Sequence, residues 1–104
     1  MPTLHIEHAV TGVDAWRSAF ARFEDARRRA GVTAVRVARP VDRDDYLMID
    51  LDFPSTEQAA DFLGFLRRSV WATPANSPAL AGAPTAMVLT ELDPAPAAGG
   101  QRAG

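Results

Sequence analysis

His8 is the residue of this chain best suited to acid–base chemistry. It interrupts an apolar face formed by Leu4, Ile6 and Val10, just before a predicted helix. A histidine exchanges a proton near neutral pH, so in a pocket between a sheet and helices His8 could act as a base toward an acidic phenol or enol. The alternative is a structural histidine that is hydrogen-bonded at the helix start, for example to Asp14.

Four further residues are candidates for binding a substrate. Trp71 and Asn76 flank an irregular stretch that is expected to close over the helix side of the sheet, and Tyr46 is expected to help shape the pocket. Arg27 falls on an apolar helix stripe and could neutralise an anionic substrate. In the alternative interpretation its stem lies along apolar surface and its head reaches water.

A second group of ionisable residues is predicted on the opposite face of the sheet. His5 and Glu7 could pair across strands with Asp50 or Arg36. Two carboxylates and an imidazole can also suggest a metal site, but metal sites need clustered ligands at defined spacing, and nothing here enforces it. We therefore expect a network of ion pairs and no metal. No phosphate loop, nucleophile elbow, flavin or nicotinamide fingerprint is present, so no cofactor is expected.

The elements that must position these residues are built around the stretch 46–66. Residues 46–53 alternate as a strand with one apolar face. Ser55 and Gln58 form a capping-box pattern at the start of a helix whose apolar stripe extends to Val70. A strand and a helix that each have one apolar face predict a two-layer unit.

The remaining elements complete a β-α-β-β-α-β order. A strand is predicted over 3–10, a helix from Thr11–Asp14 to Ala30 with Gly31 as its cap, an edge strand over 32–41 and a last strand over 85–92. The connection 71–84 is expected to hold a helical turn near Ala79. This order predicts a ferredoxin-like α+β fold, with four antiparallel strands and two helices on one face. One domain is expected over 1–93, followed by a disordered tail over 94–104.

The helix-free face of this sheet is predicted to be a homodimer interface. It mixes apolar and charged residues, which is typical of an interaction surface, and a second copy related by a two-fold axis would cover it. The alternatives are a monomer with an apolar face or a different partner protein. The predicted interface residues are His5, Glu7, Arg36, Met48, Asp50, Met87 and Leu89.

Composition excludes several other classes of protein. The net charge of −2 gives no basic surface for nucleic acid. The chain has no cysteine, so disulfides and thiolate chemistry are excluded. No segment approaches the ~20 apolar residues of a membrane span, and no signal peptide is visible at the start of the chain. The expected location is therefore the cytoplasm.

The chain as far as Leu92 resembles the dimeric α+β barrel superfamily. The resemblance is carried by HAVTGVDAWRSAF (8–20), by YLMIDLDF (46–53) and by the helix that follows. The opening strand and helix are similar to proteins of the antibiotic-biosynthesis-monooxygenase type and to cyclase-like actinobacterial proteins. In the oxygenases an asparagine and a tryptophan near the second helix help to bind an aromatic substrate, which implies such a role for Trp71 and Asn76, although their order and spacing here differ.

Two functions follow as hypotheses. The resemblance implies a cofactor-independent monooxygenase or cyclase that acts on a small aromatic or polyketide-like compound, with the substrate supplying the reducing electrons. The alternative is a non-catalytic dimeric protein that binds a ligand or serves as an accessory. A cavity of ~300 Å³ or more with His8 on its wall would favour the enzyme. Solid packing of Trp16, Phe20, Phe62 and Trp71 would favour the alternative.

Overall fold

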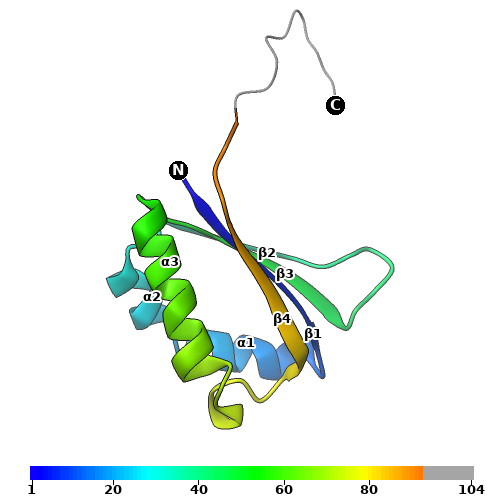
Figure 1. The fold of residues 1–104 in the computed structure, drawn as a ribbon. Helices are drawn as coiled ribbons and strands as arrows, with labels where there is room; N and C mark the ends of the chain where they lie inside the picture. Colours follow the sequence, from blue (N-terminus) through cyan, green and yellow to red (C-terminus); the bar gives the residue numbers. More distant parts are fainter. Residues whose placement is uncertain (93–104) are drawn as a thin grey trace, which may run out of the picture.

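The computed structural model describes residues 1–92, which form one sheet with helices on one of its faces (Figure 1). The predicted tail over 94–104 lies outside the described residues. Within them, no helix is long and apolar enough to cross a membrane. The elements in chain order are β1 (Thr3–Val10), α1 (Val13–Ala21), α2 (Glu24–Ala30), β2 (Ala34–Ala38), β3 (Tyr46–Asp52), α3 (Thr56–Phe65), the π-helical turn η1 (Leu66–Val70), the 3₁₀ turn η2 (Pro74–Asn76) and β4 (Leu80–Leu89).

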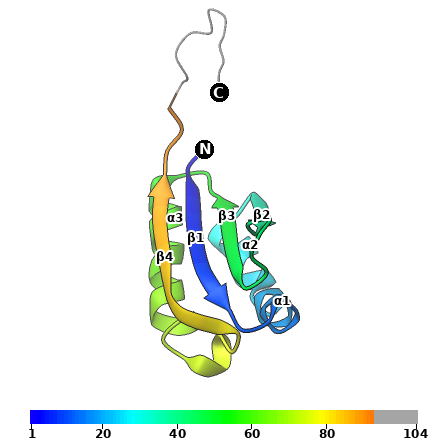
Figure 2. The same ribbon diagram turned by 90° about the vertical axis from the view of Figure 1, so that its right-hand side faces the viewer.

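The four strands are antiparallel and lie in the order β2-β3-β1-β4 (Figure 2). The predicted ferredoxin-like α+β fold is therefore confirmed, and so is the placement of β2 at an edge. β2 is shorter than the predicted strand over 32–41. In Figure 1 the hairpin between β2 and β3 projects away from the helices.

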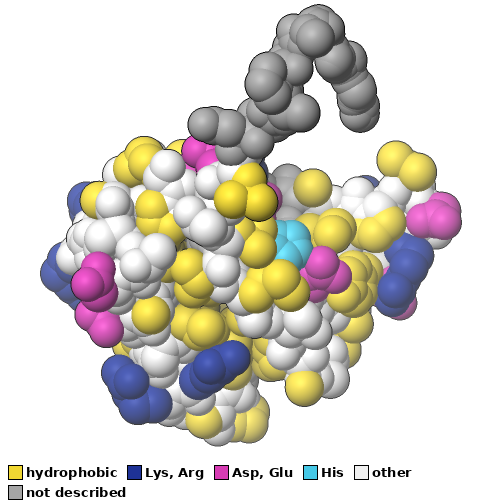
Figure 3. Space-filling model, turned by 45° about the horizontal axis from the view of Figure 1, so that its top comes forward, with side chains coloured by type: hydrophobic (Ala, Val, Ile, Leu, Met, Phe, Trp, Pro, Cys, Tyr) yellow, Lys and Arg dark blue, Asp and Glu magenta, His cyan; other side chains and the backbone are white. Residues whose placement is uncertain are grey.

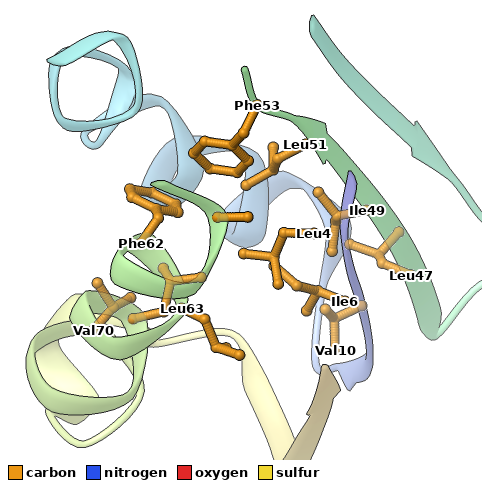
Figure 4. Packing of buried hydrophobic residues seen from close by; sticks show 12 residues of the cluster. Leu4, Ile6, Val10, Leu47, Ile49, Leu51, Phe53, Phe62, Leu63 and Val70 are labelled. Carbon is orange, nitrogen blue, oxygen red and sulfur yellow. The ribbon is translucent and has the colours of Figure 1, made fainter. Parts of the chain in front are cut away.

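The hydrophobic core lies between the sheet and the helices, as the alternation of the strands predicts. Every second residue of β1 and β3 is buried. The rings of Phe53 and Phe62 meet with their centroids 5.8 Å apart and join the two layers. Figure 4 shows these side chains converging from β1, β3 and α3. The buried cluster comprises Leu4, Ile6, Val10, Leu47, Ile49, Leu51, Phe53, Ala59, Phe62, Leu63, Leu66 and Val70.

The first helical segment was predicted as one helix and is two. The backbone N–H groups of Arg22 and Phe23 donate to the carbonyls of Ala19 and Phe20, three residues back, which tightens the chain and ends α1. Phe23 leaves helical geometry, and α2 then runs to Gly31, whose φ of 97° makes it the predicted left-handed cap. The break turns the chain so that the Phe23 ring meets the edge of Phe65.

The third helix begins as predicted and ends differently. The Ser55 hydroxyl accepts a hydrogen bond from the Gln58 N–H at 3.2 Å, which confirms the cap. The predicted helix to Val70 is interrupted after Phe65, because the Trp71 N–H donates to the Leu66 carbonyl, five residues back, at 2.7 Å. Such wide π turns shift the direction of the side chains that follow them and often occur at functional sites.

The last strand starts five residues earlier than predicted, because it contains a bulge. Glu7 pairs with Thr85, but Ala9 pairs with Ala81, so the register shifts opposite His8. Gly82, with φ of 73°, takes up the left-handed conformation there. The helical turn predicted near Ala79 lies instead at η2.

Candidate functional site

A cavity lies between the helices and the covered face of the sheet. Its volume is about 70 Å³, which is room for roughly five water molecules at ~10–15 Å³ each and less than the ~300 Å³ typical of drug-sized ligands. Its wall is mainly aromatic and aliphatic. The lining residues are Ile6, His8, Trp16, Ala19, Phe20, Phe23, Arg27, Ile49, Leu51, Phe62, Leu66, Val70, Trp71, Asn76, Ser77, Ala79 and Leu80.

His8 lies on this wall and is held as a neutral imidazole. It is only 5% exposed, and burial lowers the pKa of its ring below the usual value. Its Nδ1 lies 2.9 Å from the Ala9 carbonyl oxygen. A carbonyl can only accept, so Nδ1 carries the ring proton and Nε2 keeps a lone pair. Nε2 has no hydrogen bond to the part of the chain that the structure describes, and the suggested bond to Asp14 is not formed.

The strand bulge explains how a histidine of β1 comes to face a cavity. On one side His8 pairs with Leu47 of β3, but on the other side the β4 register shifts around it. Bulges often lie next to active sites, where they redirect a side chain. Gly82 and Pro84 are the sequence signals of such an irregularity, but they fall in the predicted connection 71–84.

Arg27 also lines the cavity. Its side chain is 9% exposed, and its Nη1 donates to the Phe20 carbonyl at 2.7 Å. The guanidinium carbon lies 3.7 Å from the centroid of the Phe20 ring, close enough for a cation–π contact. The alternative of a solvated head is therefore wrong for this arginine. Burial lowers the pKa of the guanidinium from its usual value.

Trp71 and Asn76 meet at the same cavity from the segment after α3. Trp71 follows directly on the π turn η1, so its position depends on the widened backbone there. The Asn76 side-chain amide donates to the Ser69 carbonyl at 2.7 Å and ties η2 to the end of the helix. The structure thus brings together four of the five candidate residues, and it adds Phe20 and Phe23 to the wall of the cavity.

Tyr46 does not belong to this group. It lies on the helix-free face, where its hydroxyl donates to the Glu7 carboxylate at 2.8 Å. The expectation that it shapes the same pocket as Trp71 fails, because side chains alternate along β3 and Leu47, not Tyr46, faces the helices.

The helix-free face holds a connected cluster around His5. Its Nδ1 lies 2.6 Å from an oxygen of Asp50, and its Nε2 lies 2.8 Å from an oxygen of Glu7. Carboxylates accept hydrogen bonds, so both ring nitrogens must donate and the ring is positively charged. The bond to Glu7 is the main cause that raises the pKa of His5, and the same bond lowers the pKa of Glu7.

A second ion pair lies beside this cluster. Nη1 and Nη2 of Arg36 donate to the two carboxylate oxygens of Asp52 at 2.9 and 2.8 Å. The Thr3 hydroxyl donates to the same carboxylate. The Arg36 guanidinium is the main cause that lowers the pKa of Asp52 to about 2. Of the two cross-strand partners predicted for His5 and Glu7, Asp50 forms an ion pair with His5, whereas Arg36 pairs with Asp52 instead. The described residues 1–92 contain no cluster of ligands suited to a metal ion.

Comparison with known proteins relates this geometry to other folds. No protein-family model and no curated protein matches the chain. SnoaB, a cofactor-independent oxygenase from Streptomyces nogalater, superposes with a TM-score of 0.67 at 19% identity, over 91% of this chain and 96% of that chain. An antibiotic biosynthesis monooxygenase superposes at 0.63 and 9% identity, over 89% of this chain and 100% of that chain. The chain has the fold of these monooxygenases.

A third match extends the comparison to a protein described by its assembly. A dimeric ferredoxin-like protein from an uncultured marine organism superposes with a TM-score of 0.62 at 7% identity, over 88% of this chain and 97% of that chain. At these identities the likeness concerns the fold, and the chemistry must be argued from the side chains of this chain.

Proposed function

We propose that the chain is a cofactor-independent monooxygenase that acts on a small aromatic compound in the cavity between helices and sheet. The observation that carries the proposal is His8, a neutral and buried imidazole on the cavity wall with an unbonded Nε2. The likeness to SnoaB supports the same class of reaction. The aromatic wall formed by Trp16, Phe20 and Trp71 suits a flat apolar ring.

The chemistry needs a base and no bound redox group. His8 Nε2 takes the O–H proton of the phenol or enol, which leaves an anion whose charge is shared with a ring carbon. That carbon keeps its one hydrogen and reacts as a carbanion. The carbanion passes an electron to O₂, and the two radicals join in a C–O bond to give a peroxide. The protonated peroxide loses water and leaves a ketone. The substrate carbon is oxidised, one oxygen atom is retained and the other leaves as water. Without O₂, the same carbanion could attack a carbonyl of the same molecule, which is the cyclase form of the hypothesis.

The size of the cavity favours a second candidate, a non-catalytic ligand-binding or accessory protein. The cavity of about 70 Å³ is smaller than the ~150 Å³ cavity that holds benzene in an engineered protein core, so a single ring requires the segment from Trp71 to Ala79 to move outward, and a fused polyketide requires a larger movement. A single-ring phenol or enol is therefore the substrate class that we propose for the enzyme.

The two candidates are separated by oxygen uptake with a panel of single-ring and fused-ring hydroxylated aromatics. For the enzyme we expect turnover that falls about 100-fold or more in His8→Gln, the usual size of a lost general base. His5→Gln is the matched control, because it removes the histidine on the opposite face. Full turnover in His8→Gln would remove the base. Binding without oxygen uptake anywhere in the panel would favour the accessory protein.

We also propose that the chain forms a homodimer through the helix-free face. Met87 and Leu89 are 46% and 40% exposed there, and Figure 3 shows hydrophobic side chains beside a histidine and an acidic residue. The marine ferredoxin-like protein is described as dimeric, which supports the dimeric state that we propose. His5, Glu7, Arg36, Met48 and Asp50 complete the proposed interface, and their charges pair within one chain, which lowers the cost of covering them.

A further inference from the structure

Arg27 is a buried cation that forms no ion pair within residues 1–92, and the charge of Glu24 acts on it only from beyond ion-pair distance. No carboxylate among residues 1–92 lies within ion-pair distance of its guanidinium, whereas Arg28, the next residue, pairs with Asp25 at 2.8 Å. Arginine presents five N–H donors, and Arg27 uses one of them, toward the Phe20 carbonyl. A buried charge is costly unless it is paired and hydrogen-bonded, so this arrangement requires a reason.

The guanidinium is also held in a fixed orientation. Its central carbon lies over the Phe20 ring, 3.7 Å from the centroid, and that ring stacks on Trp16 with centroids 4.6 Å apart and an angle of 23°. The bond from Nη1 to the Phe20 carbonyl fixes rotation within the plane. Nε and Nη2, which form the other edge of the fork, have no partner in the described part of the chain. That edge has the spacing that matches the two oxygens of a carboxylate.

We propose that Arg27 binds the carboxylate of a small aromatic acid, with the ring of the ligand against the aromatic wall of the cavity. The inference rests on the proposed function in that it places the ligand in the same cavity. It deepens that proposal by naming the substrate class: a single-ring carboxylic acid, ionised when bound. His8, which also lines the cavity, stays neutral and so remains available as a proton acceptor.

The test compares benzoate with benzamide, which have the same shape and differ in charge. Trp16 and Trp71 both line the cavity, so quenching of tryptophan fluorescence reports binding, and calorimetry provides the affinity. We expect benzoate to bind at least about tenfold more tightly than benzamide, because hydrogen bonds to charged groups are the stronger ones. Arg27→Gln should abolish this preference. Arg28→Gln, which removes an exposed and already paired arginine, should keep it.

The outcomes distinguish a failure of the proposed carboxylate site at Arg27 from a failure of the proposed oxygenase. Equal binding of the two probes by the unmodified chain, no binding of either, or a retained preference in Arg27→Gln would overturn the role of Arg27. If Arg27→Gln does not fold, binding of benzoate and benzamide is compared on the unmodified chain and on Arg27→Lys, which keeps the charge. Preference for benzoate without oxygen uptake by any aromatic would support the carboxylate site and reject the oxygenase. Oxygen uptake that is equal for neutral and anionic substrates would support the oxygenase and reject the carboxylate site.

Discussion

The two histidines of β1 lie three residues apart and have opposite environments, because successive side chains of a strand face opposite sides of the sheet. His8 faces the helices, is 5% exposed and has one neutral partner, the Ala9 carbonyl. His5 faces away from them, remains partly accessible and touches two carboxylates. Burial lowers the pKa of the first, and the carboxylates raise the pKa of the second.

This difference assigns different tasks to the two faces. The covered face combines an apolar wall with a neutral imidazole and an unpaired arginine, which are groups able to bind and deprotonate a ligand. The helix-free face combines exposed apolar residues with charges that are already paired, which suits contact with another protein. The following predictions test this division, beginning with the largest expected effect.

The covered face should carry most of the folding stability. Phe53→Ala removes a ring that is fully buried against Phe62 and should lower the free energy of unfolding by about 3–5 kcal/mol. Leu89→Ala, on the other face, should cost less than about 1 kcal/mol at protein concentrations where the chain is monomeric. Urea denaturation measures both. Equal losses would mean that the two faces are not distinct in packing.

The helix-free face should carry self-association. Met87→Asp places a charge in the proposed interface and should weaken the dimer about 100-fold or more, since a buried unpaired charge costs several kcal/mol. Ala60→Asp, on the exposed side of α3, is the control and should have no effect. Sedimentation velocity measures the dissociation constant. A monomer at all concentrations, or a dimer unaffected by Met87→Asp, would contradict the proposed interface.

The charged histidine should make stability depend on pH. The folded pKa of His5 is raised, so its contribution is complete below the unfolded value of about 6.5 and is lost as pH rises through the folded pKa. Unfolding free energies measured by urea should therefore decline with pH from about pH 6.5 to about pH 9, and less so in His5→Gln. Burial lowers the folded pKa of His8, so this residue makes stability rise with pH toward the unfolded value of about 6.5, and His8→Gln should remove that rise.

The Arg36–Asp52 pair should have the smallest effect, limited to acid. With its pKa lowered to about 2, Asp52 contributes stability above its unfolded pKa of about 3.8 that is lost as pH falls toward 2. Arg36→Gln should move the midpoint of acid unfolding to higher pH. An unchanged midpoint in Arg36→Gln would show that solvent screens this exposed pair completely.

The sequence predicted the two faces well because strand alternation is a local property. The positions of His5, His8 and Asp50 followed from a period of two along β1 and β3, and the Ser55 cap followed from a short motif. The break at Phe23, the π turn before Trp71 and the bulge opposite His8 were missed, because each depends on contacts between distant segments. Tyr46 was placed in the pocket against its own alternation, and the missing partner of Arg27 could be found only in three dimensions.

The division between the faces is tested most directly by measuring the pKa values of both histidines in the intact protein, using ¹H–¹³C NMR spectra of the imidazole rings across a pH titration. The account predicts that His5 titrates above the ordinary value of about 6.5 and His8 below it, with His8→Gln and His5→Gln assigning the signals. Equal pKa values, or a His8 that remains charged at neutral pH, would contradict it.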